Sequence, residues 1–408
     1  MFNKIKTFES FKVPAYRIYY GSMVGNWFAQ SMAMMVRSLL ILRLTDSAMA
    51  IGLMSLALAI PSLLISLLGG ALADRFPKKF ILIGSRGGLA LISLGVAFAL
   101  YTGFLSSENP GSWMLLIAAA ALEGVINGFL MPVNMAIIPE IVDHGRVMNA
   151  ISLSMMGQNV FRLASPILAG WIIDAFGFAD IYFTMTGMYF LATAILIFLP
   201  LTGRQTYRGS GAIGDIVNGF RYIKREKIIM VVVIFTVCHV ISGQPFNQLL
   251  PVFTEKILNV SATKLGTLLA VSSIGSLISS ISMASLPNKK RGLLLLLSGV
   301  IMGGALVVFS FSRWWSLSLG LMPLVAMGQT LHGTLTSTII QTNVSPDYRG
   351  RMQSFNTMSS GLSSLGTFFA GALSGAIGIQ WSIAGLAIFL IVVSAFLIIK
   401  VPELRKLD

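Results

Sequence analysis

Residues 380–400 read QWSIAGLAIFLIVVSAFLIIK, a stretch that decides how the rest of the chain is interpreted. It contains no acidic or basic residue before Lys400. An α-helix rises about 1.5 Å per residue, so ~20 apolar residues are needed to cross ~30 Å of hydrocarbon. The stretch has that length and that composition, and we therefore predict that it crosses a membrane as one helix.

Runs of the same kind recur along the whole chain, which is 55% hydrophobic and only 11% charged. Soluble domains carry roughly 25% charged residues, because a surface that faces water needs them. The sequence therefore predicts an all-α membrane protein. Its twelve transmembrane helices are expected at residues 17–42, 48–72, 80–104, 113–137, 147–173, 180–200, 228–252, 264–286, 292–311, 315–341, 352–376 and 380–400.

The longest connection, residues 201–227, divides these helices into six and six. We expect an N-terminal bundle at 1–200, a linker with an amphipathic helix at 201–227, and a C-terminal bundle at 228–408. A weak repeat supports two pseudo-symmetric bundles, because Gly145-Arg146 opens the fifth helix and Gly350-Arg351 opens the eleventh, 205 residues later. Transporters are often built from such parallel halves, with the substrate site between them.

Basic residues concentrate in alternate connections, whereas the opposite connections hold only Arg43, Lys256, Lys264 and Arg313. Positive charge marks the cytoplasmic side of a membrane protein. We therefore expect a multi-pass protein of the bacterial cytoplasmic (inner) membrane with both termini in the cytoplasm. The net charge of +14 is explained by this distribution and not by nucleic-acid binding. With one cysteine and three histidines, the chain offers no metal-site spacing, and we expect no metal, no cofactor and no enzymatic activity.

Arg37, Glu123 and Arg162 are expected deep inside the predicted spans, whereas Arg86 is counted with the basic connection 73–86. Each of the three costs roughly 2.5–3.5 kcal/mol to insert, so each needs a partner or a purpose. Counting the helical rise places Glu123 and Arg162 close to the same depth and Arg37 nearer the outer end of the first helix. Two interpretations stay open: a structural Glu123–Arg162 bridge, and a functional acid that titrates as its partner or substrate changes.

Polar residues at helical spacing accompany these charges and predict a hydrated substrate cavity. Its expected lining is Asn26, Gln30, Asn127 and Gln158 in the first half, and His239, Gln244, Asn247 and Gln329 in the second. His239 is either a hydrogen-bonded core residue or a proton relay. Gln244-Pro245 is expected to interrupt the seventh helix.

Residues 70–79 read Gly-Ala-Leu-Ala-Asp-Arg-Phe-Pro-Lys-Lys and resemble motif A of the major facilitator superfamily. Pro77 stands where that motif has its second glycine. The resemblance implies a conformational latch made by Gly70, Asp74, Arg75, Lys78 and Lys79. In it, Asp74 would accept backbone N–H groups at the start of the eleventh helix, near Met352 to Ser354.

Further segments look like the branch of this superfamily that contains enterobactin-type and macrolide-type exporters. They are Leu44–Gly52, Ile138–Glu140, Asn218–Tyr222, Leu249–Phe253 and Pro346–Arg351. In the fifth helix, Pro166 and Gly170 are similar to the end of the antiporter motif. The resemblance thus covers nearly the entire chain.

These observations predict a secondary active transporter, a proton-coupled exporter of an amphipathic small organic molecule such as a drug, macrolide or siderophore. Its expected partners are that substrate, protons and membrane lipid, and we expect a monomer. An importer or a lipid or lysolipid flippase of the same fold is the main alternative. A membrane receptor or membrane-embedded enzyme is the third, although the sequence shows neither a sizeable soluble domain nor a catalytic cluster.

Overall fold

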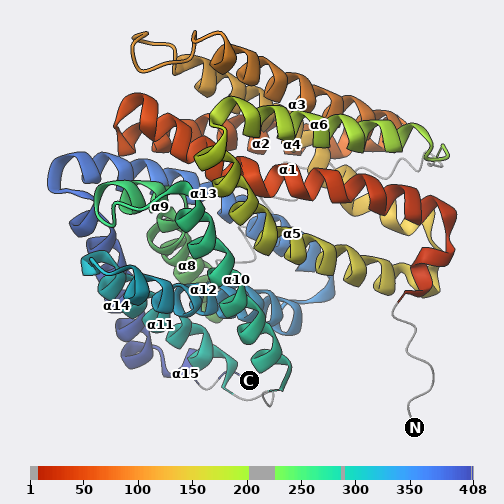
Figure 1. The fold of residues 1–408 in the computed structure, drawn as a ribbon. Coiled ribbons are helices and arrows are strands. Elements are labelled where there is room, and N and C mark those ends of the chain that lie inside the picture. Colours follow the sequence, from red (N-terminus) through yellow and green to blue (C-terminus); the bar gives the residue numbers. More distant parts are fainter. Residues whose placement is uncertain (1–7, 202–225, 286–289, 406, 408) are drawn as a thin grey trace. The chain divides into compact units, whose positions relative to one another are not determined.

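The computed structural model describes residues 8–201, 226–285, 290–405 and 407 (Figure 1). For residues 67–75, 135, 284 and 346–360 it describes the helical backbone but not the side chains. Every regular element within these ranges is a helix. The predicted all-α class is therefore confirmed, as is the membrane character of the fold.

Six long helices make up the first half of the described chain. They are α1 (Pro14–Thr45), α2 (Ala48–Arg75), α3 (Lys78–Tyr101), α4 (Met114–Ile141), α5 (Val147–Ala175) and α6 (Phe178–Ile197). Two short 3-10 turns, η1 (Glu9–Lys12) and η2 (His144–Arg146), precede α1 and α5. The predicted amphipathic helix of the 201–227 linker lies almost wholly outside the described residues.

The second half repeats this arrangement with one helix divided in two. Its elements are α8 (Lys227–Gly243), α9 (Pro245–Lys256), α10 (Ala262–Ser285), α11 (Arg291–Phe311), α12 (Trp315–Asn343), α13 (Pro346–Ile377), α14 (Ile379–Lys400) and α15 (Pro402–Arg405). Each predicted span coincides with one of these helices, and the span 228–252 coincides with α8 and α9 together. The expected interruption at Gln244-Pro245 is confirmed, because proline has no N–H to continue the helical ladder. Pro132, Pro166 and Pro323, in contrast, lie inside continuous helices.

Eight helical stretches of the described chain are long and apolar enough to cross a membrane by length and composition alone. The long helices α1, α5 and α12 lie outside this set, whereas the described side chains of α13 form a shorter apolar stretch, Gly361–Ile377. At least α1 and α5 contain the predicted polar stripes, with Arg37 in one and Arg162 in the other. Low hydropathy therefore marks the helices with polar interiors and does not argue against their crossing the bilayer.

The chain forms two compact units. Unit 1 contains residues 1–44 and 57–209, and unit 2 contains residues 45–56 and 210–408. The first turns of α2 thus belong to unit 2, which differs from a simple division at the linker. Within unit 2, Ser55 on this segment donates a hydrogen bond to Ser364 of α13 (2.9 Å). Gly52 allows the close approach, since a Cβ atom there would lie 2.6 Å from Phe368 Cα.

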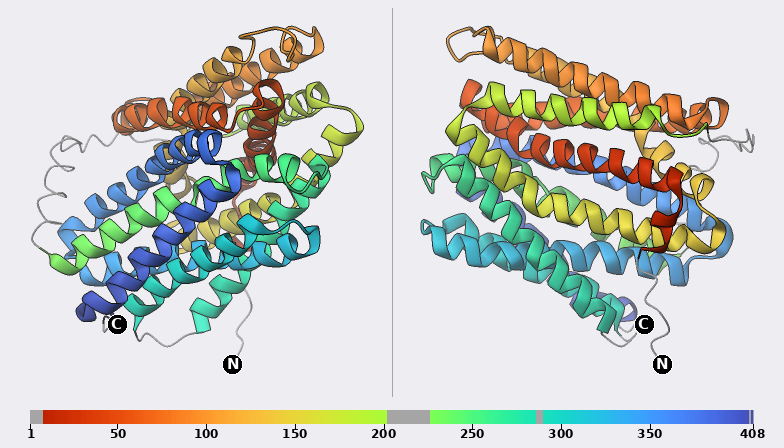
Figure 2. Two further views of the ribbon diagram at one scale, coloured as in Figure 1. Left: turned by 90° about the vertical axis from the view of Figure 1, so that its left-hand side faces the viewer. Right: turned by 45° about the vertical axis from the view of Figure 1, so that its right-hand side comes forward.

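Helix packing within the two units follows the same pattern. In unit 1, α3 packs along α6 and α4; in unit 2, α11 packs along α14 and α12 (Figures 1 and 2). Close helix pairs recur as well, since Gly124 lies against the Leu58 carbonyl and Gly275 against the Pro323 carbonyl. The equivalent pairings account for the internal repeat and agree with the predicted pseudo-symmetry.

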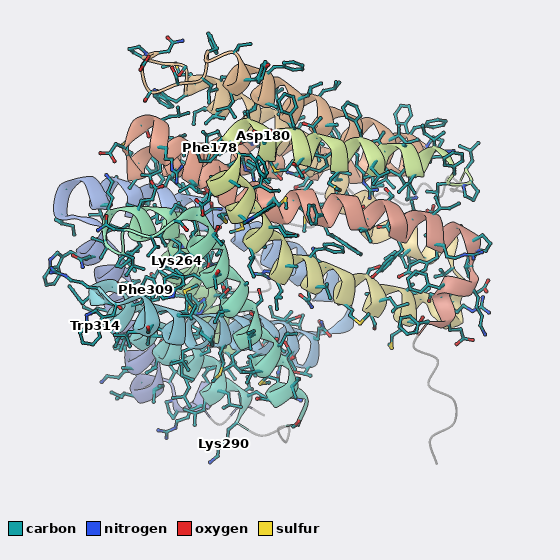
Figure 3. The ribbon with its side chains drawn as sticks, in the orientation of Figure 1. Phe178, Asp180, Lys264, Lys290, Phe309 and Trp314 are labelled. Atoms are coloured by element: carbon teal, nitrogen blue, oxygen red, sulfur yellow. The ribbon has the colours of Figure 1, made fainter. Side chains whose placement is uncertain are left out.

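Large apolar side chains occupy both the interior and the surface of each unit. In unit 2, Phe309 (labelled in Figure 3) is one such interior residue. Its ring packs on those of Phe246 and Phe253, with centroids 4.8 and 4.9 Å away. On the outside, Ile281 and Phe389 are exposed, together with many other large apolar residues. A surface this rich in apolar side chains suits a lipid solvent, because in water it would be an aggregation hazard.

Candidate functional site

The interior of unit 1 contains an ion pair between Arg37 of α1 and Glu123 of α4. The Arg37 guanidinium donates a hydrogen bond to Glu123 Oε2. Both side chains are largely withdrawn from the surface, with 18% and 16% of their areas exposed. A carboxylate is costly to remove from water unless a cation meets it, so this pairing explains how α4 tolerates an acid.

The structure pairs Glu123 with Arg37 in place of the predicted Arg162. Arg162 of α5 is exposed, and it forms no ion pair with any residue that the structure describes. The error came from the end of the first helix, which continues to Thr45 instead of stopping at residue 42. Counted from that end, Arg37 lies about 12 Å into the helix, and Glu123 lies about 13 Å from Met114. The two side chains are therefore level with each other.

Two tyrosines of α6, Tyr182 and Tyr189, lie within electrostatic range of both Glu123 and Arg37. They are 3% and 7% exposed. Their seven-residue spacing places them on one face of α6, and that spacing was the signal that sequence analysis overlooked. The ion pair thus lies among groups from α1, α4 and α6.

The predicted cavity residues of unit 1 differ in exposure. Asn26 is buried and Asn127 is half-buried. Gln30 and Gln158 are exposed. The polar residues of α1, α4 and α5 therefore extend from the interior of the unit to its surface, where a solute can reach the outer ones.

Arg86 is the largest side chain that is fully buried among the described residues. Sequence analysis counted it with the basic connection after α2, but it lies two turns inside α3. Its guanidinium donates to Ser22 Oγ and contacts Met23 Sδ at 2.7 Å. Its Nε has no partner among the described residues, and no described carboxylate pairs with it. Unit 1 therefore carries a buried positive charge whose partners are neutral.

The segment that resembles motif A is partly described. The side chains of Gly70, Asp74 and Arg75 lie outside the described residues, as do those of Met352 to Ser354, so the expected latch stays a prediction. Lys78 is buried and forms an ion pair with Glu140 of α4. Lys79 Nζ donates to the Ile197 carbonyl at 2.7 Å. The two lysines therefore bind α3 to the ends of α4 and α6.

The fifth-helix residues Pro166 and Gly170 are both buried, within a continuous α5. The neighbouring Ser165 is buried too, and its hydroxyl has no hydrogen-bond partner among the described residues. Small residues at this face permit close helix packing. The structure places the motif in a packed interior.

In unit 2, three polar contacts follow one another between α8–α9 and α12, and we call them the polar ladder. The hydroxyls of Thr236 and Thr336 lie 3.4 Å apart. The rings of His239 and His332 are stacked, with centroids 3.7 Å apart. Asn247 Nδ2 donates a hydrogen bond to Gln329 Oε1 at 3.5 Å. Gln244, which was also predicted to line the cavity, lies half-buried at the break between α8 and α9. His239, which was expected in the cavity lining, is fully buried, and its partner His332 was not among the predicted site residues.

No group of three or more His, Cys, Asp or Glu side chains that could hold a metal ion occurs among the described residues. Each unit therefore carries its own candidate site: the Arg37–Glu123 pair and the polar stripes in unit 1, and the polar ladder in unit 2. Helix pairs with polar interiors, repeated in two equivalent units, define the architecture of a secondary transporter.

The sequence profile described as Major Facilitator Superfamily matches residues 20–365. This chain belongs to that family, which consists of transporters and not of enzymes. It is 23% identical over 391 residues to the staphyloferrin A transporter of Staphylococcus aureus, covering 94% of each chain. It is also 23% identical over 372 residues to the enterobactin exporter EntS of Escherichia coli, covering 89% of this chain and 83% of the relative.

Solved structures agree with the fold. The crystal structure of the nucleoside transporter NupG superimposes with a TM-score of 0.71 at 14% sequence identity, covering 94% of this chain and 98% of the other. Identity this low shows the common fold alone. The protein is thus a multi-pass membrane protein with bacterial relatives, and a small molecule is its expected substrate.

Proposed function

We propose that this protein is a proton-coupled exporter of an amphipathic small organic molecule, working by alternating access in the bacterial cytoplasmic membrane. The observation that carries this proposal is the Arg37–Glu123 ion pair in the interior of unit 1. The distribution of basic residues supports cytoplasmic termini. The protein acts as a monomer in this proposal, with protons, substrate and lipid as its partners.

Glu123 is the proposed coupling group because its charge controls the contact between α1 and α4. When it is ionised, the carboxylate binds Arg37 and joins the two helices. When it takes up a proton, the attraction is lost and the Arg37 charge must find water or a substrate oxygen. Proton uptake therefore changes both the packing and the charge of the interior. Arg162, on the exposed face of α5, remains a candidate contact for substrate.

The substrate class follows from the chemistry of the interior and from the relatives. The proposed cavity lining offers amide side chains that can form hydrogen bonds, and apolar surface surrounds them. The lining residues proposed in unit 2 carry no charge. The members of the whole lining are Asn26, Gln30, Asn127, Gln158, Gln244, Asn247 and Gln329. Two relatives are named for siderophores, one as an exporter and one as a transporter. A siderophore or another polyoxygenated molecule of macrolide type fits such a lining.

The motif A segment is the proposed latch between conformations. Lys78 and Lys79, which begin α3 directly after the segment that contains Asp74, join α3 to α4 and α6. Asp74→Asn would remove the charge that the proposed latch needs. We expect this substitution to lower the transport rate while leaving equilibrium substrate binding within about twofold, since the substrate contacts lie elsewhere.

The test is transport of labelled enterobactin and of a labelled macrolide in proteoliposomes, with and without an imposed pH gradient. We expect gradient-driven movement of at least one substrate that is lost in Glu123→Gln and partly kept in Glu123→Asp. Gradient-driven flux that persists in Glu123→Gln would refute the coupling assignment. Flux that runs with the proton gradient would identify an importer, and movement of a labelled lysolipid alone would identify a flippase.

A further inference from the structure

The two buried histidines of unit 2 form a single, closely packed group. The rings of His239 on α8 and His332 on α12 are parallel to within 5°, with their centroids 3.7 Å apart. They are 0% and 4% exposed. The ring of Phe235 meets both edge-on, at 6.2 and 5.5 Å. This packing fixes both imidazoles and separates them from water.

None of the four ring nitrogens has a hydrogen-bond partner among the described residues. A neutral imidazole carries one donor and one acceptor, and buried groups of this kind are nearly always satisfied. Ser242, on the same face of α8 as His239, has a buried hydroxyl that also lacks a described partner. A stable apolar core would not retain two such rings, so the group is built for a ligand that can use ring nitrogens.

A shared metal ion does not fit this geometry. The lone pairs of an imidazole lie in its ring plane, and two parallel planes 3.7 Å apart cannot direct their lone pairs at one ion. A metal would also need further ligands, and the described chain offers no cluster of three candidate side chains. A proton, in contrast, needs only one ring nitrogen.

The electrostatic surroundings allow one proton and not two. Among described side chains, the only charge-bearing group that acts on His332 is His239. The helices packed around the pair carry few other titratable groups. Cys238 lies beside His239 in the sequence. The remaining groups lie at helix ends, and they are Lys227 on α8, Glu255 and Lys256 on α9, Lys264 on α10, Arg291 on α11 and Lys400 on α14. The remainder of α12 and the described side chains of α13, from Gly361 onward, add none. A first charge is stabilised by the π face of the neutral ring, and a second would be repelled by the first.

The internal repeat places this pair near the level of the ion pair in unit 1, on the equivalent helices. The 205-residue offset that relates Gly145 to Gly350 carries Arg37 onto Ser242 and Glu123 onto Gly328. His239 precedes Ser242 by three residues and His332 follows Gly328 by four. Because α8 and α12 are antiparallel, both shifts run the same way along the unit, by about 4.5–6 Å. Equivalent helix pairs in the two units thus carry an interior polar pair at nearly the same level.

We propose that His239 and His332 together form a second proton-binding site, which takes up a single proton on a ring nitrogen of one of the two histidines. The inference rests on the proton coupling proposed above and adds a site in the other unit. In the arrangement seen here both rings are neutral, since a charged imidazole without water or a counter-ion is unfavourable. The proton enters when α8 and α12 separate enough to admit water, and the break at Gly243–Pro245 gives α8 a hinge for this movement.

Nitrogen-15 NMR of histidine-labelled protein in lipid nanodiscs tests the site directly, because the chain has only three histidines. His144 is exposed in η2 and provides an internal reference. Spectra are compared between about pH 5 and 8, the range in which histidine ordinarily titrates. We expect the nitrogens of His239 and His332 to respond together, with an uptake of one proton per chain for the pair.

The variants His239→Gln and His332→Gln, with His144→Gln as the matched control, identify the signals. Each core substitution should abolish the joint response, while His144→Gln should leave it intact. Two rings that stay neutral throughout the titration would overturn the proposal, as would two independent protonations. The wild-type spectrum alone decides between these results, even if a core variant fails to fold.

The proposed function is tested by a different measurement. Glu123→Gln protein should still show the one-proton response of the histidine pair, because Glu123 lies in the other unit. If Glu123→Gln keeps full gradient-driven flux, the assignment in unit 1 fails while the NMR result stands. If the pair does not titrate but Glu123→Gln abolishes coupling, the histidine site fails and the proposed function stands.

Discussion

Breaking the Arg37–Glu123 pair should destabilise the protein by an amount that the structure allows to be worked out. Removing one partner of a buried ion pair costs about 3–5 kcal/mol, because the other charge is left without compensation. The two side chains keep 18% and 16% of their areas exposed, so we take the lower end, about 3 kcal/mol. For a cooperative unit of this size, each kcal/mol shifts the melting temperature by about 2–4 °C. Glu123→Gln and Arg37→Met are thus each expected to lower it by about 6–12 °C.

A double-mutant cycle in detergent, followed by scanning fluorimetry, measures the coupling between the two residues. The double variant leaves no unpaired charge, so we expect it to be more stable than either single variant, with a coupling energy of about 2 kcal/mol or more. Arg162→Met is the matched control, and as an exposed arginine it should change stability by less than about 0.5 kcal/mol. Additive effects of the two substitutions, or an Arg162 effect as large as that of Arg37, would refute the pairing and with it the coupling assignment.

Three further substitutions test other features. Gly275→Ala places a Cβ against the Pro323 carbonyl and should lower the free energy of unfolding by about 1–3 kcal/mol. Gly304 has open space around it, so Gly304→Ala is the control and should be neutral or slightly stabilising. Equal effects of the two substitutions would contradict the packing of Gly275. Arg86→Met removes a buried charge that has no described carboxylate partner, so it should maintain or raise the melting temperature. We also expect it to lower the flux in proteoliposomes. A large loss of stability would contradict the view that the Arg86 charge is uncompensated. Asp46→Asn loses only an exposed ion pair with Lys256 and should change unfolding by about 1 kcal/mol or less.

The fold was predictable because a bilayer leaves few choices. Apolar runs of the right length must form helices, since lipid offers no partner for backbone N–H and C=O groups. Even the interruption of the seventh helix followed from Pro245, which cannot continue the ladder. Helix ends were less predictable: α13 begins at Pro346, six residues before the expected residue 352, because polar residues continue a helix beyond its apolar core.

The site was predictable in depth but not in direction. Counting residues placed Glu123 at the correct depth, but the sequence does not state which helix faces it. Helix α1 ends three residues later than predicted, and this difference places Arg37, and not Arg162, beside Glu123. Arg86 was missed because a basic residue near a helix start is normally assigned to the adjoining loop. His332 was missed because its importance depends on stacking with a residue 93 positions earlier, which only the fold reveals.

The two units place different chemistry at equivalent positions, and the difference has an energetic consequence. Each proton that crosses 100 mV contributes about 2.3 kcal/mol, enough to hold a roughly 50-fold gradient of a neutral substrate. Two protons would hold a gradient of roughly 2,000-fold. In the proposed cycle, proton release from Glu123 would restore an ion pair, whereas proton release from the histidine pair would restore a neutral, dry stack. The two proposals thus give each unit a deprotonated state with its central helices packed together, and this similarity would allow two different pairs to respond to the same change in packing.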